Sequence, residues 1–161
     1  MPPATPSTSL QLCFAPDLFH VALDLSAARI VDQTLWLGSD EMAHIEKLTL
    51  TAEKGTNHKS IPVSDFLRLP HGDDQEIDIE GIAYSDHYLW VVGSHSLKRK
   101  RVKLDEHSPA ENFQRLETLS MEENRYLLGR IPLVNGQLHQ SCAHPEDLGK
   151  TLKAGQLKRE K

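Results

Sequence analysis

Short apolar runs separated by polar turns recur along the chain, and this pattern is typical of β-strands joined by tight turns. The clearest case is "DLSAARIVDQTLWLGSDE" (24–41), in which a short apolar run, the polar turn "VDQT" and the stronger run "LWLGS" follow one another. Aromatic and branched aliphatic residues favour strands, so this stretch predicts a β-hairpin. A second hairpin with the same order is predicted in "DIEGIAYSDHYLWVVGSH" (78–95), where "SDHY" is the turn.

The two predicted hairpins are similar to each other at an offset of 54 residues, 78 minus 24. Asp24 corresponds to Asp78 and Trp36 to Trp90, and the turns fall at the same place. The alternative is that two ordinary hairpins share these features by chance. We interpret both tryptophans as core residues rather than stacking platforms, because burying an aromatic side chain removes a large apolar area from water.

Each hairpin is followed by two more apolar stretches, which gives units of four short strands. The first unit (24–70) continues with "IEKLTL" and "DFLRLP", and the second (78–134) with "KRVKL" and "RYLLGRIPLV". Units of this size are typical of β-propeller blades. We therefore expect an all-β, propeller-like fold with two blades and part of a third, after a flexible lead-in at residues 1–9. Because a propeller closes with about four to eight blades, this single domain (10–161) is expected to be truncated or to self-associate.

Two local motifs add detail to this strand pattern. "SPAENFQRLETLS" (108–120) has a Ser in the N-cap position, Pro at the first helical position and Glu three residues after the Ser, which predicts a short helix near 109–119. "LVNGQL" (133–138) places Asn-Gly between apolar flanks, the strongest short signal for a hairpin turn.

Composition narrows the class of protein. The chain has 161 residues, 39% hydrophobic and 25% charged, as in a globular domain, and its net charge of -5 argues against nucleic acid as a partner. Cys13 and Cys142 are far apart and form no metal-binding motif. No apolar run approaches the roughly 18 to 20 residues of a membrane span, and no secretory signal is visible. We therefore expect a cytoplasmic protein with neither a membrane nor a nucleic-acid partner.

Several stretches resemble an uncharacterised, mostly bacterial family, the domain of unknown function family numbered 3616. The resemblance is carried by "LWLGSDE", "EIDIEGIAY", "YLWVVGSHSLKRKR", "ENRYLLGRIPLV" and "HQSCAHPED", and it runs from about residue 10 to the C-terminus. It implies a β-propeller longer than this chain. It implies no activity, substrate or catalytic residue.

The "DIEG" stretch is also similar to the entry strand of calcium-dependent lactonase and phytase-like propellers, in which a glutamate turns toward the central channel and binds metal. This likeness implies a Ca²⁺ ligand at Glu80 only. The first hairpin has Ser26 at the corresponding position. Any further metal ligands would therefore come from outside this chain.

Asp78 and Glu80 are the first two candidate ligand-binding residues. On a regular strand, residues two apart leave from the same face, so their carboxylates are expected to lie together. Ca²⁺ takes six to eight oxygen ligands, and two carboxylates alone are too few. The alternative is structural: Asp78 caps a turn, and Glu80 bonds backbone amides across a bulge at Gly81.

His95, in "GSHS" at the end of the second hairpin, is the third candidate. One hypothesis combines it with Ser94 and Glu80 for nucleophilic catalysis, but no strained GxSxG elbow is present. A structural or solvent-facing histidine is the alternative. The neighbouring "KRKR" (98–101) is either a nucleic-acid patch or a cationic strand that pairs with the acidic "SDEMAHIE" of the first unit. We prefer the pairing.

These observations lead to two functional hypotheses, and whether the chain is an enzyme stays open. The first is a propeller-type binding or scaffold module that holds a metal or a small anionic ligand in a central channel. The second is a metal-dependent hydrolase, lactonase- or phosphoesterase-like, with Glu80 as one ligand and its other site residues outside the chain. An inactive fragment is a third alternative.

Overall fold

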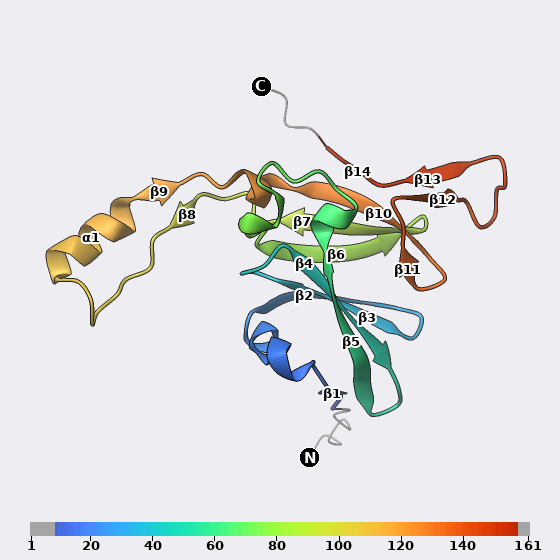
Figure 1. Cartoon of the computed structure of the whole chain (residues 1–161), viewed down its shortest axis with the longest axis horizontal. Helices are drawn as coiled ribbons and strands as arrows, with labels where there is room; N and C mark the ends of the chain where they lie inside the picture. Colours follow the sequence, from blue (N-terminus) through green and yellow to red (C-terminus); the bar gives the residue numbers. More distant parts are fainter. Residues whose placement is uncertain (1–8, 158–161) are drawn as a thin grey trace, which may run out of the picture.

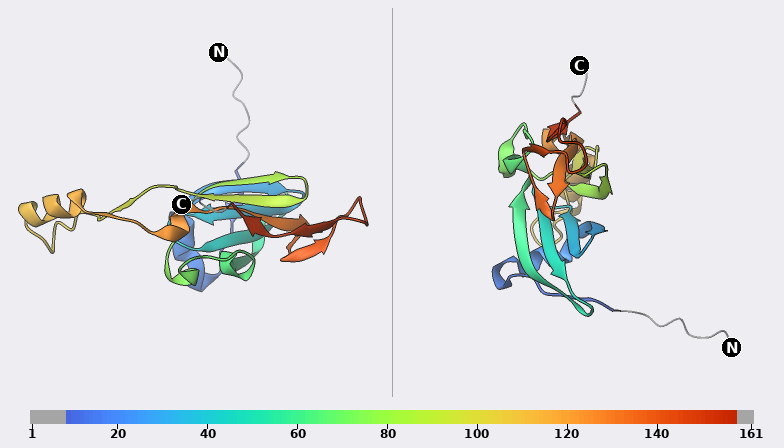
Figure 2. Two further views of the ribbon diagram at one scale, coloured as in Figure 1. Left: turned by 90° about the horizontal axis from the view of Figure 1, so that it is seen from above. Right: turned by 90° about the vertical axis from the view of Figure 1, so that its right-hand side faces the viewer.

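The computed structural model describes residues 9–157, so nearly all of the predicted lead-in at residues 1–9 lies outside the described residues. The body consists of two β-sheets packed on each other, and a thin arm projects from one end (Figures 1 and 2). Strands predominate, and the fold is all-β and propeller-like, as the sequence predicts.

The first sheet has the order β1-β5-β4-β3-β2 and is antiparallel except that β1 is parallel to β5. Its strands are β1 (Gln11–Leu12), β2 (Leu25–Val31), β3 (Thr34–Ser39), β4 (His44–Leu50) and β5 (Lys54–Pro62). The second sheet has the order β11-β10-β7-β6, and β14 also pairs with β10. Its strands are β6 (Ile79–Ser85), β7 (Tyr88–Gly93), β10 (Leu128–Val134), β11 (Gln137–Leu138) and β14 (Gly155–Gln156).

Smaller elements connect and extend the sheets. Two short ribbons pair β8 (Lys98–Arg99) with β9 (Leu119–Ser120), and β12 (Ser141–Ala143) with β13 (Thr151–Lys153). The helices are η1 (Pro16–Leu23), η2 (Val63–Asp65), η3 (Gly72–Asp74), α1 (Pro109–Glu117) and η4 (Glu123–Tyr126). Within the described part of the chain, none of these helices is long and apolar enough to cross a membrane.

The predicted hairpins are confirmed as β2–β3 and β6–β7. Both carry a register shift near their start, between Leu25 and Ala27 in the first and between Ile79 and Gly81 in the second. The Asn-Gly hairpin is also confirmed, because "NG" forms the two-residue turn between β10 and β11 with positive φ angles of 50° and 68°.

Two of the predicted outer strands are wrong. In the first unit the fourth strand is β5, "KGTNHKSIP", whereas "DFLRLP" follows it as η2 and a loop. In the second unit "KRVKL" (100–104) forms no strand, because the two-residue β8 (Lys98–Arg99) ends just before it, and β10 pairs directly with β7. Apolar content was a poor guide to both outer strands. In the first unit, the buried side chains of β5 are partly polar, so this strand has no clear apolar pattern. In the second unit, the segment after β8 leaves the sheet.

The main core lies between the two sheets. It contains Trp36 and Ile79, both fully buried, together with side chains from β7 and β10. The sheets approach closely at Gly38, where a Cβ would lie 2.5 Å from Cγ2 of Ile79. A smaller cluster covers the other face of the first sheet, where Leu12 and Phe14 of the N-terminal segment pack on buried leucines of β3 and β4.

The two tryptophans differ in burial, so the core interpretation holds for Trp36 but not fully for Trp90. Trp90 is half-buried and lies outside the core clusters. Leu89 and Val91 on the same strand face the inter-sheet core. Because successive strand residues point to opposite faces, Trp90 must lie on the outer face of the second sheet, where the guanidinium of Arg130 lies 5.7 Å from its ring.

Polar side chains form a buried cluster between β4 and β5. The Glu46 carboxylate is fully buried; it accepts a hydrogen bond from Ser60 Oγ at 2.8 Å and lies 2.7 Å from His58 Nε2. His58 Nδ1 accepts a hydrogen bond from the backbone N–H of Ala15 at 3.2 Å, so Nε2 carries the proton donated to Glu46. Phe14 packs edge-on against the His58 ring. The cluster therefore holds the N-terminal segment on the first sheet.

The predicted helix is confirmed as α1, with Ser108 and Glu111 forming a reciprocal capping box. It lies at the tip of the arm, which we define as residues 97–121, and not between body strands (Figure 1). Asn112 is 5% exposed and fastens the preceding turn to the helix: its side chain bonds both backbone groups of Lys103 and the carbonyl of His107.

Replacing the central acid of the buried cluster tests its contribution to stability. Glu46→Ala is expected to lower the free energy of unfolding by about 2–4 kcal/mol, because Ser60 and His58 would keep buried donors without an acceptor. Urea denaturation followed by circular dichroism measures the change. Glu53→Ala, at an exposed site in the β4–β5 turn, is the control and should stay within about 0.5 kcal/mol. Equal effects of the two substitutions would contradict this role.

Candidate functional site

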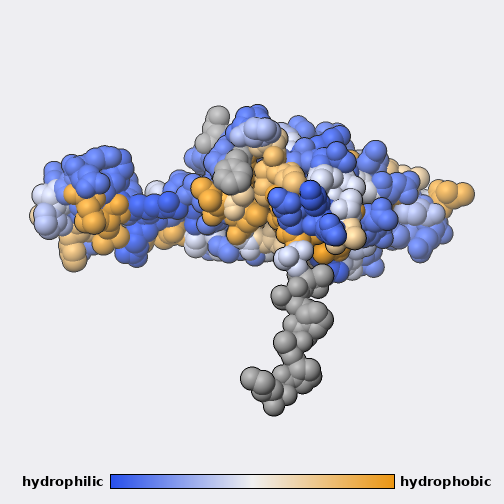
Figure 3. All heavy atoms as spheres, turned by 90° about the horizontal axis from the view of Figure 1, so that it is seen from below, coloured by the Kyte–Doolittle hydropathy of each residue, from blue (hydrophilic) through white to orange (hydrophobic). Residues whose placement is uncertain are grey.

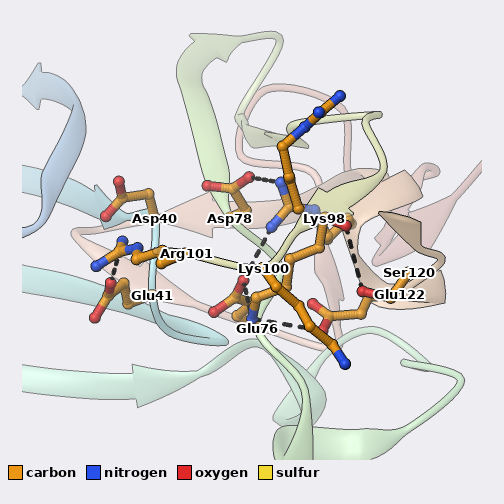
Figure 4. A pocket seen from close by; sticks show the side chains of 11 residues that line it. Asp40, Glu41, Glu76, Asp78, Lys98, Lys100, Arg101, Ser120 and Glu122 are labelled. Atoms are coloured by element: carbon orange, nitrogen blue, oxygen red, sulfur yellow. Dashed lines mark hydrogen bonds and ion pairs between the residues drawn. The ribbon is translucent and has the colours of Figure 1, made fainter. Parts of the chain in front are cut away.

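A pocket of about 670 Å³ opens where β3 ends, β6 begins and the arm leaves the second sheet (Figure 4). Charged side chains of both signs form almost all of its wall. The lining residues are Asp40, Glu41, Glu76, Asp78, Lys98, Arg99, Lys100, Arg101, Ser120, Glu122 and Arg125. Four segments of the chain, 40–41, 76–78, 98–101 and 120–125, therefore meet at one polar site.

Arg125 organises the inner wall of this pocket. It is 8% exposed; its guanidinium pairs with the Glu76 carboxylate at 2.9 Å and with the Asp78 carboxylate. The same guanidinium donates to the hydroxyl of Ser96 at 3.0 Å and to the Ser96 carbonyl at 3.3 Å. A buried cation is stable only when it is paired and hydrogen-bonded, and these contacts supply both conditions.

The backbone around Arg125 is close-packed as well. The Arg125 carbonyl accepts a hydrogen bond from the His95 N–H at 3.0 Å. A Cβ at Gly93 would lie 2.5 Å from that carbonyl oxygen and 2.9 Å from the carbonyl oxygen of Ile77. The glycine of "VVGSH" is therefore required by this close approach of three chain segments.

Asp78 lines the pocket, whereas Glu80 does not. Asp78 has a φ of 58° and precedes β6, and the register shift after Ile79 makes the strand irregular at Glu80. The expectation that both carboxylates leave from one face of a regular strand is therefore wrong. The predicted irregularity next to Gly81 is present as a register shift, but the Glu80 carboxylate makes no hydrogen bond within residues 9–157, so the predicted bonds to backbone amides are absent. At the corresponding position of the first hairpin, the Ser26 hydroxyl bonds the Ile79 carbonyl and so links β2 to β6.

His95 also lies outside the pocket lining. Its Nε2 lies 3.1 Å from the Leu127 carbonyl, so this nitrogen carries the proton, and its ring packs against Tyr126. Ser94 accepts a hydrogen bond from Ser96. Within residues 9–157 the structure joins Ser94, His95 and Glu80 by no hydrogen bond, so the hypothesised nucleophilic arrangement is not assembled.

The "KRKR" strand pairs with acids of the body, as predicted. Arg101 contacts Glu41 of "SDEMAHIE" at 2.6 Å, in an exposed pair. Lys98 Nζ lies 2.7 Å from Glu76 and 3.4 Å from Glu122. Burial alone would lower the pKa of Lys98, but the hydrogen bonds and charges of these two carboxylates outweigh it and raise the pKa above its ordinary value. Lys98 is therefore a fixed cation.

Several polar groups at the site keep free bonding capacity. Lys100 lines the pocket and has no ion-pair partner among the described residues. Asp40 Oδ1 and Glu122 Oε2 are buried acceptors that have no hydrogen-bond partner within residues 9–157. A neighbouring pocket of about 240 Å³ shares Glu122 and adds two more buried polar atoms without a partner among the described residues, His44 Nδ1 and Gln75 Oε1. The site thus combines an uncompensated ammonium group with unsatisfied acceptors.

Sequence reasoning missed the residues that build this site, above all Arg125, Glu76 and Glu122. Each lies in a loop or a short helix outside the repeating hairpins, and each pairs with a residue more than twenty positions away. In the sequence, the only hint of these residues is that two of them are charged residues in or beside the quoted motifs. Glu76 lies just before "DIEG", and Arg125 lies within "ENRYLLGR".

A family model for proteins of unknown function, DUF3616, matches residues 24–161. The chain belongs to this family. The resemblance seen in the sequence motifs is therefore confirmed, and the match begins at Asp24, the first residue of the first hairpin stretch. No curated protein and no solved structure matches this DUF3616 chain.

The predicted metal ligand of this DUF3616 chain, Glu80, is exposed. Within residues 9–157, no three His, Cys, Asp or Glu side chains come together in a group that could hold a metal ion. Metal binding at Glu80 stays a prediction, and any such site needs ligands from elsewhere.

Removing the central cation tests how the DUF3616 pocket is held. Arg125→Met is expected to cost about 3–5 kcal/mol of stability, because Glu76 and Asp78 would lose their shared buried partner. Arg125→Lys should recover only part of this loss, since one ammonium group cannot reach both carboxylates and Ser96 together. Thermal and urea unfolding measure both.

The matched control for Arg125 is the exposed pair at the pocket rim. Arg101→Met removes the contact with Glu41, in which the Arg101 side chain is 82% exposed. Its expected cost is at most about 1 kcal/mol. A cost as large as that of Arg125→Met would show that the pocket is held by its rim rather than by Arg125.

Proposed function

We propose that this chain is a ligand-binding module of β-propeller type, and that its ligand is a small hydroxylated anion bound in the charged pocket. The observation that carries the proposal is the set of pocket groups that have no partner among the described residues: the Lys100 ammonium and the buried acceptors Asp40 Oδ1 and Glu122 Oε2. An ammonium group attracts an anionic group, and unpaired acceptors favour hydroxyl donors.

The fixed part of the pocket supports binding rather than a purely structural role. Arg125 and Lys98 are held by Glu76 and Glu122, so the wall is pre-organised before any ligand arrives. Pre-organised polar groups lower the cost of ordering the site on binding. Lys100, by contrast, is exposed and makes no ion pair with the described residues, so its charge is available to a ligand.

A shared plan of the two sheets supports the propeller part of the proposal. Trp36 pairs in register with Lys47, and the Lys47 ammonium lies 5.3 Å from the Trp36 ring. Trp90 pairs in register with Arg130, which lies 5.7 Å from the Trp90 ring. In each sheet, the second strand of the hairpin (β3 or β7) thus carries a tryptophan whose ring contacts a cation on the neighbouring strand (β4 or β10). We infer that the two sheets are repeats of one unit.

The position of the pocket agrees with a channel-facing site. β2 and β6, the first strands of the two units, lie side by side and are joined through Ser26. The pocket opens at the start of β6, beside the end of β3. In a ring of such units, the first strands would line the centre and the pocket would lie at one mouth of the channel.

A ligand screen tests the proposal directly. The full chain is titrated with phosphate, sulfate, hydroxy acids and sugar phosphates, and the melting temperature is recorded by differential scanning fluorimetry. A hydroxylated anion is expected to raise it, because a ligand at about 100 times its Kd stabilises by about 2.7 kcal/mol. Phosphate and sulfate should act more weakly, since they lack hydroxyl groups for the acceptors.

Substitutions connect the screen to the pocket. Lys100→Ala should abolish the shift without lowering the melting temperature of the free protein, since Lys100 makes no ion pair in the described part of the chain. Lys150→Ala, at an exposed lysine of the β12–β13 loop, should leave the shift unchanged. A shift that survives Lys100→Ala, or a screen without any shift, would refute the proposed ligand class.

The second candidate is a metal-dependent hydrolase with Glu80 as one ligand. One observation favours it: Glu80 is exposed on β6, the strand that would face the channel, and no described residue forms a hydrogen bond or ion pair with its carboxylate. In that case Ca²⁺ raises the melting temperature of the full chain, EDTA reverses the effect, and Glu80→Gln removes it. The absence of any Ca²⁺ shift would discard the metal role.

A further inference from the structure

The N-terminal segment, which we define as residues 9–15, covers the outer face of the first sheet. Its strand β1 pairs in parallel with β5, and Leu12 and Phe14 pack on three buried leucines of β3 and β4. Figure 3 views the molecule from the side on which β1 and η1 lie in Figure 1, and apolar side chains gather on this face of the body. Release of the segment would therefore uncover an apolar surface of the first sheet.

The His58 ring holds the last residues of this segment. The Ala15 N–H donates to His58 Nδ1 at 3.2 Å, and the Phe14 ring lies edge-on to the same ring at 4.9 Å between centroids. On its other side, His58 Nε2 lies 2.7 Å from Glu46 Oε2. Nδ1 thus accepts a hydrogen bond while Nε2 donates one. Only the neutral imidazole with its proton on Nε2 makes both bonds.

Glu46 is the charged group that faces the His58 ring. Lys47 of β4 and Lys59 of β5 are paired in register, and successive strand residues point to opposite faces, so both lysines lie on the face away from His58. Within residues 9–157, the other charged or titratable residues of β4, β5, the turn between them, the N-terminal segment and η1 form no hydrogen bond or ion pair with His58. They are Cys13, Asp17, His20, His44, Glu53 and Lys54. A second proton on His58 therefore acts on two polar contacts, those with Glu46 and Ala15.

The two contacts respond to this proton in opposite ways. An imidazolium still donates from Nε2 to the Glu46 carboxylate, so that contact becomes an ion pair and is kept. On the other side Nδ1 becomes a donor, and two N–H groups would face each other 3.2 Å apart. The His58 side chain is 2% exposed, so water does not relieve this conflict. Protonated His58 and docked Ala15 therefore exclude each other.

We propose that His58 is a pH-sensitive switch that docks and releases the N-terminal segment. Neutral His58 holds the segment on the first sheet, whereas protonated His58 keeps Glu46 and releases Ala15, which opens the cover over the leucines of β3 and β4. The released state binds one more proton than the docked state, so docking is strongest above the range in which histidine titrates, about pH 5 to 8, and weakens as the pH falls through it. The released fraction rises at most about tenfold per pH unit in this range.

Hydrogen exchange of the full chain tests this proposal, independently of any pocket ligand. Amide protection factors, corrected for the intrinsic pH dependence of exchange, are measured between about pH 5 and pH 8. The amides of Cys13 and Ala15 donate to the Gly55 carbonyl and to His58. Their protection is expected to fall at least about tenfold from the upper to the lower end of this range. Amides of β3, inside the first sheet, should keep their protection.

His58→Gln separates the switch from other effects of acid. The amide side chain donates from its nitrogen and accepts at its oxygen, so it replaces both contacts of the ring but gains no proton in this range. Protection of residues 11–15 should then become independent of pH. His20→Gln, at an exposed histidine of η1, is the matched control and should keep the pH dependence of the unsubstituted chain. Circular dichroism and the melting temperature show whether the variants fold.

A second variant keeps the test decisive if His58→Gln fails to fold or to dock the segment. Ala15→Pro removes the N–H that opposes the imidazolium, and the φ of -60° at Ala15 suits proline. Protection of the remaining amides in 11–14 should be lower than in the unsubstituted chain but should no longer depend on pH. Unchanged protection of the unsubstituted chain across the range, or a full pH dependence in either variant, overturns the proposal.

Discussion

The buried guanidinium of Arg125 is the interaction on which the arrangement of the charged pocket depends. It comes from η4, just before β10, and binds the carboxylates of Glu76 and Asp78 at the start of β6 and the backbone of Ser96 at the base of the arm. An unpaired cation at 8% exposure would be costly, so these contacts hold the three segments together around Arg125. The left-handed conformation of Asp78 is held by the same contact.

The second constraint is the close contact between the sheets. β2 and β6 lie side by side through the hydroxyl of Ser26, and the absence of a side chain at Gly38 makes room for Ile79. Trp36 fills the space between the sheets, and Lys47 above it reaches the carbonyl of Gly136 in the hairpin of the second sheet. One face of the first sheet is thereby covered by the second sheet, while the N-terminal segment covers the other face through Phe14.

Short-range patterns predicted much of this fold. The paired hairpins, the Asn-Gly turn and the capping box at Ser108 each depend on a few neighbouring residues, and each is present. β5 was missed because its inward side chains, His58 and Ser60, satisfy a buried carboxylate rather than an apolar core. The site was missed for a related reason: Arg125 and Glu76 are 49 positions apart, and no local period joins them.

The arm has two different parts: a base whose cations pair with the body, and an outer part with exposed apolar side chains. At its base, two of the four cations of "KRKR" pair with acids of the body: Lys98 lies between Glu76 and Glu122, and Arg101 contacts Glu41. Beyond Arg101 the body no longer supplies partners, and within the arm Lys103 pairs only with Glu106 among the described residues. Residues 102–121, which hold six of the exposed apolar side chains of the arm, contain two basic and four acidic residues, so this part of the arm has a net charge of -2. The ion pairs at its base fix the direction of the arm, and the exposed apolar side chains farther out determine what it can contact.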